Sequence, residues 1–207
     1  IDYIFFDKEV LPTNLRKDWI SNGLGKVSGE KRTMDIRIEK TKRSIKNAFI
    51  ELRSRKSLER ITVKEVCEKA EINKSTFYSH YQDIYDLSDK LETEVVESII
   101  GSLNHPENLL KNPEGFTKEL YLGYAAKNAL ICILFSDSRS GNLVQKLEKT
   151  LKELVFSVCP EYREDPKENV KLTYTIYGGY YAYFENREYG DELVISTIGR
   201  LSGNMDI

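Results

Sequence analysis

The chain has 207 residues, 40% of them hydrophobic and 31% charged, which suits one or two globular domains and excludes a wholly disordered protein. Its longest apolar runs, such as residues 129–135, are far shorter than the ~20 residues that a membrane-spanning helix requires. No basic leader followed by a long apolar region is seen, so we expect a cytoplasmic protein with no membrane partner.

The formal net charge of −2 hides an uneven distribution along the chain. Residues 31–82 hold 14 Lys and Arg against 7 Asp and Glu, whereas residues 83–207 hold 13 against 21. A basic segment joined to an acidic remainder is typical of a protein that places one part against a polyanion. Charge alone supports equally well a solvated surface that has no such partner.

The three cysteines, Cys67, Cys132 and Cys159, are widely spaced and lie in apolar runs. An odd number at such spacings favours buried free thiols in a reducing compartment over a disulfide framework or a metal site. We therefore expect no metal ion and no other cofactor.

Residues 1–34 are predicted to be a mostly flexible N-terminal extension, because they show no sustained period and include turn-forming residues between 21 and 32. Trp19 and Ile20 are the candidates for local anchors in it. From Ile38 the pattern becomes helical, since apolar side chains recur every three or four positions. The residues expected on that apolar face are Ile38, Thr41, Ile45, Ala48, Phe49 and Leu52.

Two further helices are predicted between residues 62 and 82. Thr62 followed by Glu65 forms the pattern of a capping box, and Asn73 is placed to cap the next, short helix. Phe77 and Tyr81, four positions apart, are expected to face inward. Residues 35–82 thus form a three-helix domain, and a longer amphipathic helix follows through Leu87, Leu91, Val95 and Ile99.

Residues 83–207 are predicted to be a larger helical domain, with breaks near His105, Pro113, Ser136 and Cys159. No stretch alternates as a half-buried strand does, so the predicted fold class is all-α. The penultimate helix contains Gly178 and a crowd of aromatic residues, which more often form core or interface than line a pocket. These aromatic residues are Tyr174, Tyr177, Tyr180, Tyr181, Tyr183 and Phe184, and the last helix is expected to be amphipathic through Leu193, Ile195, Ile198 and Leu201.

The short helix that follows Asn73 is too polar to be a core element. A helix, a tight turn and a second short helix form a helix-turn-helix arrangement, whose second helix lies in the major groove of DNA. Phe77 and Tyr81 then attach this helix to its scaffold and leave the other positions free. The predicted DNA-binding residues are Thr62, Lys74, Ser75, Thr76, Tyr78, Ser79 and His80.

Each of these residue types has a role available on DNA. Lys74 can donate to guanine acceptors or to a phosphate, and Ser75 and Thr76 can reach base edges. Tyr78 and His80 can donate to phosphate oxygens, which fixes position without reading sequence. Taken singly, each has an ordinary alternative: Thr62 as a helix cap, Tyr78 as a packing aromatic and His80 as a surface imidazole. Their combination carries the prediction.

Residues 36–91 resemble the N-terminal domain of the TetR family of bacterial transcriptional regulators. The most specific part is STFYSHYQDIYDL, residues 75–87, where the family has a Thr, an apolar residue, Tyr, a variable position, His or a similar group, an aromatic and a linker ending in Leu. Two positions depart from the family pattern. Glu71 stands where the turn usually has Gly, and Ile84 stands where the fourth helix usually starts with a Lys that contacts phosphate.

The resemblance implies a homodimer that binds double-stranded DNA at a palindromic operator. It also implies that the C-terminal helices form the dimer interface and a pocket for a small-molecule effector. A ligand-responsive repressor is the favoured interpretation. The alternative is a DNA-binding protein controlled by a protein partner, while an enzyme is disfavoured because no nucleotide-binding loop, metal-spaced His and Cys set or nucleophile motif is seen.

Overall fold

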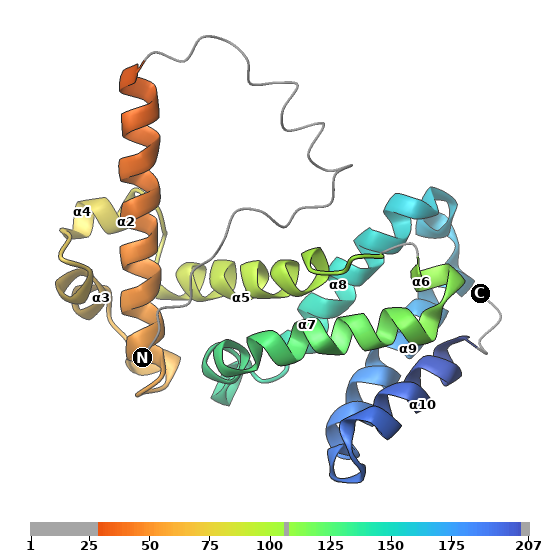
Figure 1. Cartoon of the computed structure of the whole chain (residues 1–207). Coiled ribbons are helices and arrows are strands. Elements are labelled where there is room, and N and C mark those ends of the chain that lie inside the picture. The colour runs from red at the N-terminus through yellow and green to blue at the C-terminus, as the bar shows by residue number, and fades with distance from the viewer. Residues whose placement is uncertain (1–28, 106–107, 204–207) are drawn as a thin grey trace. The chain divides into compact units, whose positions relative to one another are not determined.

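The computed structural model describes residues 29–105 and 108–203, and its fold in these ranges is all-α, as predicted (Figure 1). None of the helices described there is long and apolar enough to cross a membrane. The described chain divides into two compact units. Residues up to Glu94 together with Ala129–Ser138 form the first unit, and Val95–Asn128 together with the residues from Arg139 onward form the second. The three-part division expected from the sequence stays a prediction.

The first unit is built from α2 (Gly29–Arg53), α3 (Val63–Ala70), α4 (Lys74–Tyr78) and the beginning of α5 (Ile84–Gly101). Helix α3 packs against both α2 and α4 (Figure 1). Packing against α3 therefore stabilises α4, which is only five residues long. The Ser44 hydroxyl on α2 donates a hydrogen bond of 3.0 Å to the carbonyl of Ala70, the last residue of α3. The core of this unit consists of side chains with almost no exposed surface: Ile45, Phe49, Leu58, Val66, Phe77 and Leu87.

Helix α2 begins at Gly29, well before the predicted start at Ile38, so residues 29–34, which the sequence placed in the N-terminal extension, are helical. The apolar period did not reveal the start of α2, because the residues before Ile38 are rich in charged side chains, which favour a helix but give no apolar face. Ile38 was wrongly expected on the buried face and is 37% exposed, while Ile45 further along is fully buried. The predicted anchors Trp19 and Ile20 lie outside the described residues.

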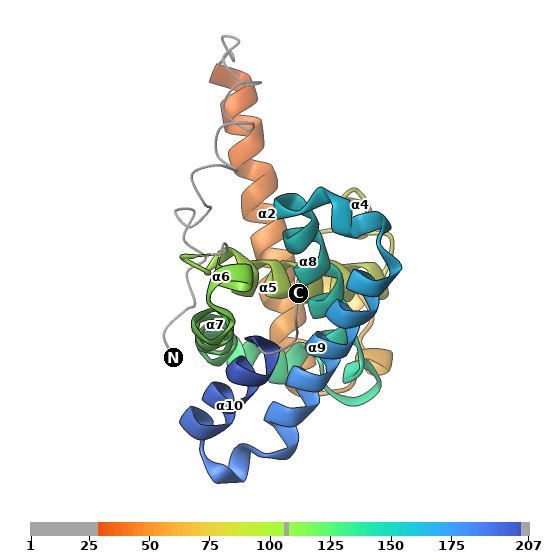
Figure 2. The ribbon, with the colours of Figure 1, turned by 90° about the vertical axis from the view of Figure 1, so that its right-hand side faces the viewer.

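The second unit contains α6 (Asn108–Lys111), most of α7 (Pro113–Leu134), α8 (Asn142–Val158), α9 (Pro166–Glu185) and α10 (Asp191–Gly203). Helix α9 packs against both α8 and α10, and Figure 2 shows α9 and α10 side by side. The buried apolar residues of this unit include two clusters, one of Leu103, Phe116 and Leu151 and one of Val155, Phe156 and Leu172.

One sequence expectation about the second unit is confirmed and one is wrong. The predicted break near Pro113 is present, since α6 ends at Lys111 and α7 begins at Pro113, whose missing N–H is not needed in the first turn of a helix. The last helix buries Val194 and Ile198, whereas Leu193 and Leu201 are 58% and 59% exposed. Spacing alone placed these leucines on the inner face, but α10 is rotated so that they point outward.

The cysteines were expected to be buried, and only Cys67 is; Cys132 is exposed and Cys159 is half-buried. Cys132 lies in an apolar run that is helical, so one side of the run faces out while Ile131 and Leu134 face in. All three cysteines are among the described residues, and none forms a disulfide.

Candidate functional site

Helix α3 begins with the capping box predicted from the sequence. The Thr62 hydroxyl accepts a hydrogen bond from the Glu65 amide at 3.3 Å, and the Glu65 carboxylate accepts from the Thr62 amide at 3.0 Å. Lys56 also bonds to this carboxylate, and these contacts, with the Lys56 hydrogen bond the largest, lower the pKa of Glu65 to about 2. Thr62 therefore acts as a cap in the structure, and its role on phosphate stays a prediction.

Helix α3 ends at Glu71, which adopts the left-handed conformation with φ 55° and ψ 44°. The Ile72 amide donates to the Cys67 carbonyl at 3.0 Å, and the Glu71 amide donates to the Glu68 carbonyl at 3.4 Å. This pair of bonds is the Schellman ending, in which the left-handed residue is usually glycine. The turn between α3 and α4 is thus formed in the usual way with an unusual residue, which bears a conformational cost.

Asn73 caps α4 as predicted, and its side-chain oxygen accepts three hydrogen bonds. The Thr76 amide, the Thr76 hydroxyl and the Ser75 hydroxyl approach it at 2.8, 2.8 and 2.7 Å. The protons of both hydroxyls are therefore committed within the protein, and their lone pairs remain available to accept. In this arrangement Ser75 and Thr76 are suited to receive a hydrogen bond from a donor such as a base amino group.

The outward side of α4 carries most of the predicted site residues. Phe77 is completely buried, whereas Tyr78, whose ring meets that of Phe77 edge-on at 5.6 Å, is 55% exposed. The Ser79 hydroxyl donates to the Thr76 carbonyl at 2.7 Å. Lys74, Ser75, Tyr78 and Ser79 are exposed, Thr76 and His80 are half-buried at the edge, and Thr62 is exposed at the start of α3.

The end of the short helix is held to α5 by Tyr81. Tyr81 is 5% exposed, its ring lies 5.7 Å from that of Phe77, and burial raises its pKa to about 12. The Lys90 ammonium lies 5.2 Å from the Tyr81 ring centre. Ile84, which stands where the family resembled by residues 36–91 usually has lysine, is buried and offers no hydrogen-bond donor to a phosphate.

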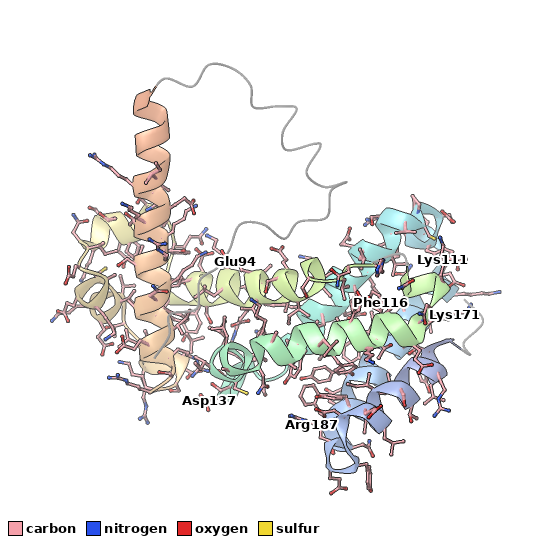
Figure 3. All side chains as sticks on the ribbon, viewed as in Figure 1. Glu94, Lys111, Phe116, Asp137, Lys171 and Arg187 are labelled. Atoms are coloured by element: carbon pink, nitrogen blue, oxygen red, sulfur yellow. The ribbon has the colours of Figure 1, made fainter. Side chains whose placement is uncertain are left out.

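An ion pair that the sequence did not indicate ties the end of α2 to the segment after α7. The Arg53 guanidinium, almost fully buried, donates to the Asp137 carboxylate at 3.2 Å and to the Ser136 carbonyl at 3.0 Å. Asp137, labelled in Figure 3, adopts a left-handed backbone with φ 52°. The two residues are too far apart in sequence for any local pattern to pair them.

The second unit contains a partly open cavity of about 120 Å³ whose walls come from α5, α7, α8, α9 and α10. Phe116, labelled on α7 in Figure 3, lines it together with aliphatic side chains such as Leu151 and Ile176. No charged side chain is among the described residues that line the cavity. Its aromatic wall is formed by Phe116, Tyr121, Tyr124, Tyr180 and Phe184.

Four hydroxyl groups of the cavity wall already donate to acceptors of the protein. Tyr121 donates to the Gly179 carbonyl at 2.9 Å, and Tyr124 donates to the Asn128 side-chain oxygen at 3.3 Å. Thr117 and Ser202 donate to backbone carbonyls one helical turn earlier, at 2.7 and 2.9 Å. Burial raises the pKa of Tyr121, so this phenol is neutral throughout the physiological range.

The aromatic residues of α9 divide into three groups. Tyr180 and Phe184 line the cavity, and Tyr183 is buried, with its ring 4.2 Å from that of Tyr121. Tyr174 and Tyr181 are 66% and 52% exposed. The sequence did not single out Tyr121 and Tyr124, because only the fold brings α7 against α9.

The chain matches no model of a known protein family, and none of the curated proteins is similar to it. Among the described residues, no group of three or more His, Cys, Asp and Glu side chains has an arrangement able to hold a metal ion.

Proposed function

We propose that the chain is a sequence-specific DNA-binding transcriptional regulator of the TetR type, which acts as a homodimer and releases DNA when a small molecule binds. The observation that carries the proposal is the surface of α4, which buries Phe77 completely and exposes Lys74, Ser75, Tyr78 and Ser79. These are donors and acceptors suited to phosphates and base edges. The resemblance of residues 36–91 to the family supports the same function.

Charge supports DNA as the partner of this surface. Residues 31–82 carry twice as many Lys and Arg as Asp and Glu, and Arg37, Lys40 and Arg43 on α2 are exposed. Exposed basic side chains release counterions when they neutralise phosphates, which is the main source of affinity for DNA. The acidic remainder of the chain is repelled by the phosphates of DNA.

Exposed apolar side chains on α9 and α10 support a homodimer. Val170 and Tyr174 on α9 are 69% and 66% exposed, and Leu193 and Leu201 on α10 are similarly open. Gly178 lies between Tyr174 and Tyr181 on α9, and a Cβ atom placed there would have no neighbour within 4 Å. A glycine inside a helix costs about 1 kcal/mol relative to alanine. Close approach of a second copy's helix would explain its presence.

The cavity favours control by a small molecule over control by a protein partner. A concave, mostly apolar pocket with a few hydroxyl groups is a usual form of ligand site. It lies in the second unit, whereas the residues proposed to meet DNA lie in the first. An effector would therefore act by preferring a dimer in which the two α4 helices no longer fit successive grooves.

Selection of duplexes from a random library tests the proposal. The full-length chain should enrich a palindrome whose half-sites are separated by about one helical turn, ~34 Å, or a multiple of it. Ser75→Ala should change which bases are enriched, while Lys127→Ala, far from α4 in sequence, serves as the control. Failure to enrich any sequence, or enrichment unchanged by substitutions on α4, would contradict the proposal.

A further inference from the structure

Resting on the proposed control by a small molecule, we propose that the effector is an uncharged aromatic compound with a single ring, of the phenol class. Three properties of the cavity point to this class: its volume, the absence of charge on the described residues that line it, and the hydrogen-bonding capacity that its hydroxyls retain.

The volume of the cavity suits a ligand with one ring. The cavity holds about 120 Å³, and an engineered apolar cavity of about 150 Å³ in another protein admits benzene. Protein interiors are packed too densely to yield a second ring's volume without moving side chains. Naphthalene-sized compounds are therefore expected to be excluded.

The walls exclude charge. No Lys, Arg, His, Asp or Glu is among the described lining residues, so a carboxylate or ammonium would enter without a counterion. An unpaired charge in an apolar site is far more costly than any gain from the ring. The aromatic wall favours a ring, because Tyr124 and Tyr180 both contact Phe184, with ring centres 5.5 and 4.6 Å away. A planar ligand extends these edge-on and tilted contacts.

The hydroxyls favour a phenol over a hydrocarbon. Four wall hydroxyls already donate their hydrogen bond to acceptors of the protein, so toward a ligand they can only accept a hydrogen bond. They belong to Thr117, Tyr121, Tyr124 and Ser202. Tyr180 differs, because its hydroxyl has no hydrogen-bonding partner among the residues that the structure describes. It can both donate and accept, so we assign it as the polar anchor. A ligand hydroxyl satisfies both requirements.

The test uses the full-length chain without DNA, with thermal unfolding and calorimetric titration of four probes: phenol, toluene, benzoate and 1-naphthol. Phenol and toluene should raise the melting temperature, phenol at the lower concentration, while benzoate and 1-naphthol should not. Tyr180→Phe should weaken phenol binding about threefold to tenfold and leave toluene binding unchanged. Tyr181→Phe, which removes an exposed hydroxyl from the same helix, should change neither.

Binding of benzoate or 1-naphthol as tight as that of phenol would overturn the inference, as would no effect of any neutral single-ring probe. Equal losses for phenol and toluene in Tyr180→Phe would remove Tyr180 as the anchor. Ile176→Trp, which fills the cavity, should abolish binding of both neutral probes. A chain that binds DNA but no probe would contradict this inference alone. A chain that binds phenol but no DNA would contradict the proposed function alone.

Discussion

Glu71→Gly should stabilise the first unit, because Glu71 holds a left-handed conformation that suits glycine better than any residue with a Cβ atom. With φ 55° and ψ 44°, the glutamate bears about 1–2 kcal/mol of steric cost. Glycine removes this cost, but it also gives the unfolded chain more conformational freedom, which lowers the free energy of unfolding by about 0.4–1 kcal/mol. Glu71 is exposed and forms no ion pair with any described residue, so no contact is lost. The midpoints of these two ranges leave a net gain of about 0.8 kcal/mol.

Chemical denaturation and thermal melting of the full-length chain measure this gain. A stabilisation of this size corresponds to a rise of about 1–4 °C in a domain of 150–250 residues. Glu71→Ala is the matched control, since it removes the same carboxylate but keeps the Cβ atom, and it should leave stability nearly unchanged. If the alanine variant gained as much as the glycine variant, the effect would come from charge. If the glycine variant lost stability, the assigned backbone strain would be refuted.

Three further predictions concern DNA contact, assembly and pH. Tyr78→Phe should weaken binding about equally on specific and random duplexes at one salt concentration, because its hydroxyl is assigned to phosphate; a loss confined to the specific site would assign it to base reading. Gly178→Ala should raise the dimer dissociation constant in sedimentation experiments, while the isolated subunit gains up to about 1 kcal/mol of helix stability; an unchanged dimer would place the interface elsewhere. The pKa of Glu65 is lowered from 4.5 to about 2, so its contribution to stability is present above pH 4.5 and is lost as the pH falls toward 2. Glu65→Gln should flatten the melting temperature over that window, and an equally steep decline in both proteins would show that other carboxylates control it.

Local features of this chain were readable from sequence because neighbours along the chain determine them. The cap at Thr62, the cap at Asn73 and the inward pair Phe77 and Tyr81 depend on residues within one or two turns. The fold class followed from the same helical spacing. The start of α2 at Gly29 was missed because charged residues that favour helix leave no apolar period.

Features that depend on residues far apart in the sequence could not be predicted from it. Tyr121 faces α9 only because the fold brings α7 there, so the composition of the cavity was not predictable. The bond from Arg53 to Asp137 likewise links positions that share no local pattern. Leu193 and Leu201 show a different limit, because an apolar residue on a helix can serve a core or a surface that meets another molecule.

The central claim is that one molecule in the second unit and DNA on the first exclude each other through the dimer. The most direct test takes a compound that raises the melting temperature of the DNA-free protein and measures its affinity with and without the selected duplex. Linkage requires DNA to lower the affinity for the compound by the same factor by which the compound lowers the affinity for DNA, commonly 5–150-fold. A complete reversal of a 1:99 population to 99:1 needs a preference of ~5.5 kcal/mol. We predict a lower affinity in the presence of DNA; equal affinities in both states would contradict the mechanism, however tightly the compound bound.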